Sequence, residues 1–501
     1  MKKKRVIARL DVKGPNVVKG IQMEGLRVVG WPGELTKRYY EQGADEIVYI
    51  DIVASLYERN NLLHVIEKAT ELGVSVPLTV GGGIRNLDDI KKILRAGADK
   101  VAINTAATRR PEMICEAAQK FGAQCIVGSV QAKRQANGKW EALVDCGREP
   151  TGKDAVSWAE QLVELGAGEL LITSVDRDGT KKGLDCELIQ KISSRVRVPV
   201  IACGGAGDVE DVADCFSQTD CDAVSLASIL HYNISSIEEI KSSLSARQIA
   251  IRCLDHDSLT PLCKPDPVSV SVVDYGLCNL RSVKRAIESL GHPVEIISLP
   301  EEVLRSQVLV LPGVGAFADG MLGLQERNLI SAIKRFAQSR RPLLGICLGM
   351  QLLMTESEEF GNHAGLDLIS GKVQTFDDPK RINETDYHVP HVGWNELHQG
   401  KGLDWEDTIL QDTKQDTNVY FVHSFKVLPE DPSHALAITR YGKQDFCSVL
   451  RKENVYGVQF HPERCGRAGL LMLRNFVRLA LCDSETPSTA MRQSRQEYAN
   501  T

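Results

Sequence analysis

The sequence is organised around one stretch, LLGICLGMQLL at residues 343–353. An apolar run leads into Cys347, which has a glycine two residues away on either side, and a helical pattern follows. Because glycine has no Cβ, Gly345 and Gly349 allow a buried strand to end in a sharp turn, as in a nucleophile elbow. The stretch therefore predicts an exposed Cys347 at the carboxyl end of a sheet, with a helix N-terminus stabilising its thiolate. Taken alone, a buried structural cysteine is the simpler interpretation.

A second stretch, VYGVQFHPE at residues 455–463, favours the catalytic interpretation. It places His461 and Glu463 two residues apart, the spacing by which a strand or its end presents two side chains on one side. A base and the carboxylate that orients it are the groups that a nucleophilic cysteine requires. Together with Cys347, these residues predict a Cys-His-Glu triad.

With these stretches, residues 268–482 resemble the class I glutamine amidotransferases. The resemblance implies that Cys347 attacks the side-chain amide of glutamine, His461 transfers the proton and Glu463 orients His461, so that ammonia leaves. It also implies that LPGVGAF at residues 311–317 is an oxyanion strand, whose N–H groups face the developing negative charge. The implied oxyanion and glutamine-binding residues are Gly313, Val314, Gly315, Gln351, His423, Ser424 and Phe425.

The composition is that of a soluble globular protein with more than one domain. The chain has 501 residues, of which 43% are hydrophobic and 25% charged, and it is long enough for two or more cores. Its net charge of -6 leaves no basic excess to neutralise a nucleic acid. No run of about 18 apolar residues could span a bilayer. Residues 1–5 are basic, but Arg9 and Asp11 follow too soon for a signal-peptide core.

The cysteines predict a reducing environment. All 14 are scattered along the chain, and they form no metal-type CxxC pairs, so we expect neither a disulfide framework nor a metal site. The predicted triad also needs a free thiol. We therefore expect a cytoplasmic protein without a cofactor.

The N-terminal half predicts a closed barrel. Between residues 5 and 244, short β-branched runs alternate with amphipathic helical patterns. Buried parallel strands separated by helices indicate an α/β fold, and about eight such units in about 240 residues are typical of a (β/α)8 TIM barrel. An open, doubly wound sheet is the alternative.

An internal repeat supports closure of the barrel. The stretch VPLTVGGGI at residues 76–84 recurs as VPVIACGGA at residues 198–206, an offset of about half a barrel, as expected from duplicated half-barrels. Each glycine cluster follows a strand, so that its N–H groups and the next helix N-terminus can hold a phosphate. Two such clusters predict a substrate with a phosphate at each end.

Residues 4–244 resemble the cyclase subunit of imidazole glycerol phosphate synthase. The resemblance rests on LDVK at residues 10–13, TVGGGI at 79–84, INTAA at 103–107, TSVDRDGT at 173–180 and GGAG at 204–207. It implies a doubly phosphorylated ribulose-type substrate and a catalytic Asp11 at the C-terminal end of a strand, where barrel catalysis occurs. The implied phosphate- and substrate-binding residues are Lys19, Gly82, Asn104, Thr105, Thr173, Asp178, Gly179, Gly205 and Ser228.

One departure from that family concerns the second catalytic carboxylate. Where the family has Asp-Ala-Lys-Arg, this chain has QAKR, beginning at Gln131. Glutamine keeps the size and hydrogen-bonding capacity of the group but cannot carry a negative charge or transfer a proton. Two interpretations therefore stay open: a cyclase of histidine biosynthesis, or a conduit with little or no cyclase activity. The conduit would pass ammonia to a separate synthetase that amidinates a nucleotide sugar in a bacterial surface-sugar pathway.

Four charged residues match the ring with which the family gates ammonia at the barrel's N-terminal mouth. Any one of them alone is compatible with a solvated charge at the start of a strand. Two acids and two bases together at the matching places favour a gate. They are Arg5, Glu46, Lys100 and Glu169.

The expected domain organisation follows from these patterns. Residues 1–250 form the barrel, and residues 251–267 form a linker stiffened by prolines. Residues 268–482 form the open α/β amidotransferase domain, and the polar residues 483–501 form a disordered tail. We expect the amidotransferase domain to dock on the N-terminal mouth of the barrel, with HVGWN at residues 391–395 as a docking candidate.

Overall fold

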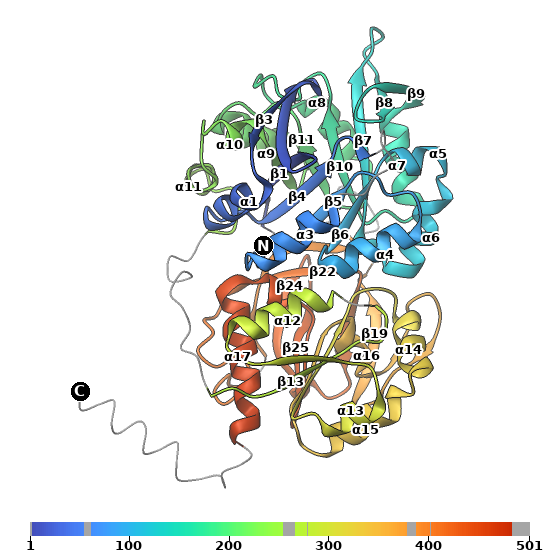
Figure 1. Cartoon of the computed structure of the whole chain (residues 1–501), viewed down its shortest axis with the longest axis vertical. Coiled ribbons are helices and arrows are strands. Elements are labelled where there is room, and N and C mark those ends of the chain that lie inside the picture. The colour runs from blue at the N-terminus through green and yellow to red at the C-terminus, as the bar shows by residue number, and fades with distance from the viewer. Residues whose placement is uncertain are drawn as a thin grey trace, which may run out of the picture.

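The computed structural model describes residues 3–54, 62–253, 266–277, 279–377, 387–400 and 402–482. Most of the predicted linker and all of the predicted tail lie outside the described residues. The described chain forms two bodies stacked on one another, with the N-terminal body above the C-terminal body in Figure 1. Among the described residues, no helix has the length and apolar character needed to cross a membrane.

The N-terminal body is a closed barrel of parallel strands. Strand β12 pairs in parallel with β1, and β7 pairs in parallel with β10, so the ring of strands has no free edge. The open-sheet alternative is therefore wrong. In order around the barrel, the strands are β1 (Arg5–Lys13), β4 (Glu46–Asp51), β5 (Leu78–Gly81), β6 (Lys100–Ile103), β7 (Ile126–Arg134), β10 (Glu169–Ser174), β11 (Val200–Cys203) and β12 (Ala223–Leu226).

Helices surround the barrel, and two hairpins extend its C-terminal end. The hairpin strands are β2 (Asn16–Ile21) with β3 (Glu24–Gly30), and β8 (Trp140–Val144) with β9 (Glu149–Asp154). The longer helices are α1 (Pro32–Glu41), α3 (Leu62–Glu71), α4 (Leu87–Ala96), α6 (Glu112–Phe121), α7 (Ala155–Glu164), α8 (Cys186–Ser193), α9 (Val209–Gln218) and α11 (Ile237–Ala246). The short helices α5 (Thr105–Arg109) and α10 (Ser228–His231) follow β6 and β12.

The side chains of each barrel strand alternate between two cores, as the period of a strand requires. In β1, Val6, Ala8 and Leu10 belong to the core between strands and helices, whereas Ile7 belongs to a separate cluster inside the barrel. The interior cluster consists of Ile7, Val48, Ile50, Ala102, Val127, Leu171, Ile201, Cys203 and Ala223. The middle of the lumen is therefore apolar.

The C-terminal body is built on a mixed sheet whose centre is parallel. Its order is β14 (Val294–Ile297), β13 (Val270–Val273), β15 (Val308–Gly313), β16 (Leu343–Cys347) and β26 (Val455–Val458). Mostly antiparallel strands then extend it: β25 (Gln444–Lys452), β23 (Phe425–Pro429), β19 (Ile369–Thr375), β17 (Met354–Ser357) and β18 (His363–Ala364). Strand β17 pairs in parallel with β19, β24 (Ala435–Tyr441) lies beside β25, and β21 (His398–Gln399) lies beside β24. The helices are α12 (Leu280–Ser289), α13 (Pro300–Arg305), α14 (Phe317–Glu326), α15 (Leu329–Gln338), α16 (Leu348–Leu352) and α17 (Gly466–Cys482).

A separate two-stranded sheet, β20 (His391–Glu396) with β22 (Asn418–His423), lies at the junction of the two bodies. The Trp394 indole of β20 donates a hydrogen bond to the carbonyl of Asp45, at 3.2 Å, just before barrel strand β4. The second body thus docks on the N-terminal mouth, and residues 391–395 take part, as expected. Figure 1 shows α12 directly below α3 and α4.

The most extensive polar contact between the bodies is made by Arg464. Its guanidinium pairs with Asp99, at 3.0 Å from both carboxylate oxygens, and donates to the carbonyl of Gly97, at 2.6 Å. Asn279 reaches the same carbonyl, at 3.1 Å. Arg464 is 1% exposed and Asp99 is 7% exposed. Because water does not solvate these two charges, each is compensated by the other.

We predict that Arg464→Met weakens docking by about 3–5 kcal/mol, because it leaves the buried Asp99 carboxylate without its cationic partner. Arg95→Ala is the matched control: it removes an interdomain pair with Asp274, at 2.8 Å, that is partly exposed and contributes about 0–1 kcal/mol. The change in unfolding free energy of both variants is measured by urea titration, monitored by tryptophan fluorescence, to which Trp394 at the junction contributes. Equal shifts in the two variants would contradict the prediction.

Candidate active site

The predicted elbow is present at the end of β16. Cys347 has φ 53° and ψ −108°, and α16 begins at the next residue. A positive φ in a non-glycine residue is strained and persists only where the surroundings impose it. Here a Cβ on Gly345 would collide with the backbone of Gly349, and a Cβ on Gly349 would collide with the carbonyl of Leu311. Gly345 is therefore required by close packing within the turn, and Gly349 by close packing of the turn against β15.

The expectation that Cys347 is exposed is wrong, since the residue is only 4% exposed. The carbonyl of Val422 in β22 lies 4.0 Å from its Sγ atom, and the amide of Gln459 donates to Sγ at 3.7 Å. The thiol is thus covered by a strand that comes from elsewhere in the fold, which the local sequence does not reveal.

The three predicted triad residues lie together. Since β26 runs beside β16, the residues after β26 reach the thiol, and His461 Nδ1 and Glu463 Oε1 are 2.8 Å apart. Burial alone would lower the pKa of His461, but the Glu463 carboxylate and Cys347 raise it well above its ordinary value. Burial alone would raise the pKa of Glu463, but His461 lowers it below its ordinary value. The geometry suits an imidazolium held by a carboxylate.

The predicted glutamine-binding residues are linked by hydrogen bonds to one another and, through Gln459, to the thiol. Gln351 donates to the carbonyl of Phe425, at 3.3 Å, and to Gln459, at 3.2 Å. His423 Nδ1 lies 2.8 Å from the same Phe425 carbonyl, and burial lowers the pKa of His423 to about 4. Ser424 donates across the junction to Gln124 of the barrel, at 3.4 Å. Sequence reasoning missed Gln459, although it lies two residues before His461 in the quoted stretch.

The predicted oxyanion strand ends beside the nucleophile. Gly313, the last residue of β15, is the register partner of Cys347. The N–H of Val314 donates to the carbonyl of Leu277, at 3.4 Å. In this conformation that N–H group is engaged elsewhere, so it has to leave Leu277 before it can stabilise an oxyanion. Gly315 follows at φ 132°.

The four predicted gate residues form one closed ring. Arg5 pairs with Glu46, at 2.9 Å, and also with Glu169. Lys100 pairs with Glu46 at 2.6 Å and with Glu169 at 2.5 Å. All four side chains are 0% exposed. Burial would raise the pKa of Glu169, but Arg5 and Lys100 lower it. The ring spans β1, β4, β6 and β10 at their N-terminal ends.

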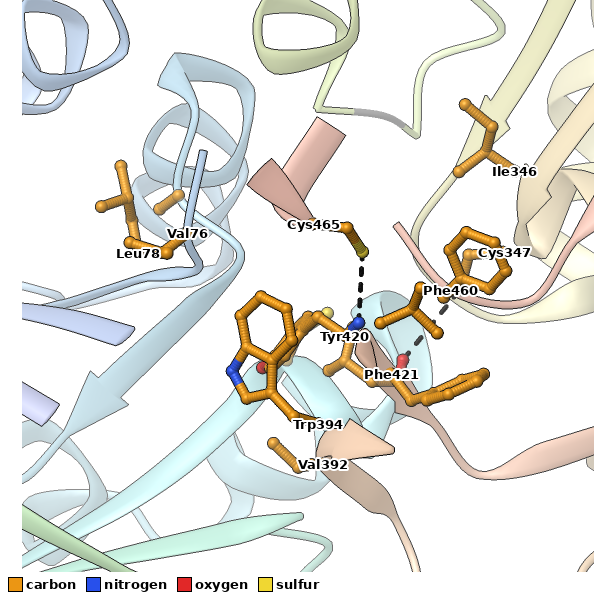
Figure 2. Close-up of a cluster of buried hydrophobic side chains, with 14 of the residues drawn as sticks. Val76, Leu78, Ile346, Cys347, Val392, Trp394, Tyr420, Phe421, Phe460 and Cys465 are labelled. Atoms are coloured by element: carbon orange, nitrogen blue, oxygen red, sulfur yellow. Dashed lines mark hydrogen bonds between the residues drawn. The ribbon is translucent and has the colours of Figure 1, made fainter. Parts of the chain in front are cut away.

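Strands β20 and β22 connect this ring to the thiol. A Cβ on Gly393 would lie 3.7 Å from Arg5 Cδ, so β20 runs directly over the ring. Tyr420 contributes to the electrostatic environment of Arg5, and Val422, on the same strand, is the residue against Cys347 Sγ. Figure 2 shows the buried apolar side chains, with Trp394 and Tyr420 among them, between Cys347 and the barrel.

At the other end of the barrel, Asp11 lies in a pocket with cations around it. Arg9 Nε donates to Asp11 at 2.8 Å, and Lys19 Nζ lies 3.3 Å from Asp11 and 2.8 Å from Asp178. Burial would raise the pKa of Asp11, but Arg9 and Lys19 lower it to about 2. Asp11 is therefore a carboxylate at neutral pH. The lining residues include Arg9, Asp11, Lys19, Gln131, Cys146, Arg148 and Asp178.

Gln131 lies in this pocket, as the sequence indicated. It is 7% exposed, and its Oε1 atom has no hydrogen-bond partner within the described part of the chain. Sequence reasoning used Arg9 only as evidence against a signal peptide. The missed signal was its position two residues before Asp11 on a strand, since such residues share a face.

The predicted phosphate-binding residues divide between two sides of the barrel's C-terminal end. Gly82 follows β5, and Asn104 and Thr105 follow β6; Asn104 donates to the carbonyl of Ser129, at 2.9 Å. On the other side, the residues lie in or after β10, β11 and β12. These are Thr173, Asp178, Gly179, Gly205 and Ser228.

Comparison with known proteins supports the family resemblance of each half of the sequence. Residues 5–236 match the family model "Histidine biosynthesis protein", and residues 271–480 match "Glutamine amidotransferase class-I". The chain is 57% identical over 207 residues to the imidazole glycerol phosphate synthase subunit HisF of Legionella pneumophila, covering 41% of this chain and 97% of that protein. It is 49% identical over 249 residues to the HisF subunit of Alkaliphilus metalliredigens, covering 50% and 98%.

The chain belongs to the imidazole glycerol phosphate synthase family. Its HisF-type barrel is fused to a class I glutamine amidotransferase domain on the C-terminal side. It is an enzyme that uses glutamine and has a barrel for a phosphorylated sugar substrate. Within this imidazole glycerol phosphate synthase-type chain, the ring of charges lies where the two halves meet.

We predict that Glu463→Gln lowers the rate of glutamine hydrolysis by about 10²–10⁴-fold. The Glu463 carboxylate raises the pKa of His461 against the lowering effect of burial, so its removal lowers that pKa. The imidazolium form is then lost at a lower pH, and the alkaline limb of the rate profile moves to lower pH. Glutamate release between about pH 5 and 9 measures this. Glu358→Gln, on the surface, is the control. An unchanged pH profile would count against the triad.

We also predict that Glu169→Gln destabilises the imidazole glycerol phosphate synthase-type barrel by about 3–5 kcal/mol near pH 7, because Arg5 and Lys100 lose a buried partner. The pKa of Glu169 is lowered from 4.5 in the folded protein. Its stabilising contribution is therefore present above pH 4.5 and is lost as the pH falls through the lowered folded pKa.

Urea titrations of wild type and Glu169→Gln at a series of pH values measure this difference. It is expected to shrink below pH 4.5. Glu187→Gln is the control, because Glu187 pairs with Lys191 at the surface, and it should change stability little. A difference that grows as the pH falls would refute the assignment.

Proposed function

We propose that the protein hydrolyses glutamine at Cys347 and delivers the ammonia through the charged ring into the barrel. There a doubly phosphorylated ribulose-type substrate receives it in chemistry of the imidazole glycerol phosphate synthase type, in histidine biosynthesis. The observation that carries the proposal is the buried ring of Arg5, Glu46, Lys100 and Glu169 between the thiol and the barrel lumen.

Glutamine hydrolysis follows from the triad. The Cys347 thiolate attacks the amide carbon, and the His461 imidazolium protonates the leaving nitrogen, so that ammonia and a thioester form. His461 then takes a proton from water, which attacks the thioester and releases glutamate and the thiol. Glu463 holds the ring of His461, at 2.8 Å. The N–H of Leu348, next after the nucleophile, and that of Val314, once it has left Leu277, are the proposed oxyanion donors.

Transfer of ammonia follows from the charge distribution. Neutral ammonia can pass between the apolar side chains of the junction, whereas ammonium would have to lose its hydration there, and a ring of two cations and two anions has no net charge to offset that cost. Arg5 pairs with Glu46 at 2.9 Å, and Lys100 pairs with Glu46 at 2.6 Å and with Glu169 at 2.5 Å. Since these contacts close the ring, at least one side chain has to move for ammonia to enter. The apolar layer inside the barrel then leads toward Asp11.

The barrel pocket supports substrate binding. Phosphate groups are assigned to the residues after β5 and β6 on one side and after β10, β11 and β12 on the other. Lys19 and Asp11 line the pocket at this end of the barrel. We also propose a reducing, cytoplasmic setting, because the described cysteines, Cys347 among them, are free thiols.

Two observations favour a second function, in which the barrel is mainly a conduit to a separate sugar-amidinating synthetase. Gln131 cannot transfer a proton, and Asp11 is held as a carboxylate by Arg9 and Lys19. Ring closure to an imidazole needs proton transfers, so this pocket is poorly equipped for acid–base catalysis.

The deciding experiment gives the full chain the ribulose-type substrate with either glutamine or ammonium and follows the imidazole product. We expect product with both nitrogen sources and an increase of about 10²–10⁴-fold in Gln131→Asp, because a carboxylate restores proton transfer. Lys133→Ala, two residues further along the same strand, is the control.

Absence of product in wild type and Gln131→Asp, while glutamine is still hydrolysed, would refute the cyclase assignment. Stimulation of that hydrolysis by an added ATP-dependent sugar synthetase would support the conduit.

A further inference from the structure

The inward-facing side chains of β1 mark successive levels of the barrel. Arg5 belongs to the charged ring, Ile7 to the apolar interior cluster, and Asp11 to the pocket at the opposite end. Arg9 lies between Ile7 and Asp11 on the same face of the strand, as the period of two requires. A molecule that moves from the ring to the pocket through the lumen therefore has to pass Arg9.

Arg9 reaches across the lumen to other strands. Its Nη1 atom donates to Thr173 Oγ1 in β10 and approaches Cys203 Sγ in β11, both at 3.1 Å. Its Nε atom donates to Asp11 Oδ1, at 2.8 Å. The side chain is 3% exposed. A planar guanidinium held on three sides leaves little room beside it in a closed barrel of this size.

The charge of Arg9 is fixed in place. A buried guanidinium needs a compensating partner, and Asp11 supplies it, with Asp178 and Lys19 in the next layer of contacts. Cysteine 203 belongs to the apolar interior cluster, so Arg9 marks the boundary between the dry lumen and the charged pocket. A cation at this boundary repels ammonium and favours the passage of neutral ammonia.

We propose that Arg9 is an inner gate, which closes the lumen at its pocket end and moves aside when an anionic group of the bound substrate competes with Asp11 for its guanidinium. This inference rests on the proposed transfer of ammonia through the barrel. In this proposal Arg9 has a positioning role, because it orients Asp11 and separates the lumen from the pocket. Ammonia then reaches the pocket only when substrate occupies it.

Cys203 provides a direct test, because its thiol touches Arg9 from the lumen side. The full-length protein is treated with methyl methanethiosulfonate, a small neutral reagent, and each cysteine peptide is followed by mass spectrometry. Cys146, half-buried in the pocket lining, reports arrival of the reagent. Cys125 and Cys447, both buried, report the integrity of the fold.

In wild type we expect Cys203 to react about tenfold or more slowly than Cys146, and Arg9→Ala to increase the rate at Cys203 by about tenfold or more. Arg148→Ala is the matched control, since Arg148 is another cation of the same pocket; it should leave the Cys203 rate unchanged. Equal rates at Cys203 in wild type and Arg9→Ala would overturn the proposal. So would a Cys203 that stays unreactive in a folded Arg9→Ala protein.

If Cys125 and Cys447 become reactive in Arg9→Ala, the fold has been lost and Arg9→Lys decides the question. Lysine keeps the charge without the forked contacts, so we expect a faster reaction at Cys203, and a wild-type rate would overturn the proposal.

A second arm supplies amide-¹⁵N glutamine together with an equal concentration of unlabelled ammonium. Opening the gate in Arg9→Ala should lower the ¹⁵N fraction of the product severalfold relative to wild type, and an unchanged fraction would overturn the gating role. If wild type itself forms no product, the proposed function fails, whereas the labelling of Cys203 still decides whether Arg9 closes the lumen.

Discussion

Charge compensation in a dry environment governs the junction between the two halves of this protein. Four charged side chains without solvent are costly unless each has partners, and Arg5, Glu46, Lys100 and Glu169 provide those partners for one another. Only β1 and β4 are neighbours among the four strands that carry them, so the four side chains meet only when the barrel is closed, and β20 covers them only when the second domain is docked. The cluster therefore depends on both closure of the barrel and docking of the second domain.

The same principle links docking to glutamine hydrolysis. Arg464, whose guanidinium pairs with the buried Asp99 of the barrel, directly follows Glu463 in the chain. The short turn that carries the triad carboxylate is therefore fastened to the barrel by a buried ion pair. Glu463 is thus one peptide bond away from this interdomain ion pair, and its carboxylate lies 2.8 Å from His461.

The pocket end of the barrel shows how a few residues can change the chemistry of a fold. Asp11 occupies the expected strand end, yet Arg9 and Lys19 keep it ionised, and Gln131 supplies no proton. The pocket therefore combines one ionised carboxylate, Asp11, with a neutral amide, Gln131. The strand periodicity that fixes the position of Asp11 also directs Arg9 into the lumen.

The sequence by itself determined the features that depend on near neighbours in the chain. The alternation of strands and helices indicated the barrel, and the spacing around Cys347 and His461 indicated the elbow and the triad, because steric limits on a turn and the period of a strand act over a few residues. Resemblance added the ring of charges. Only the tertiary structure decided that Cys347 is buried, that Arg9 lies across the lumen, and that Arg464 joins the two halves. Each of these depends on contacts between segments far apart in sequence, and burial, which sets the energy of a charge or a thiol, is a property of the assembled fold.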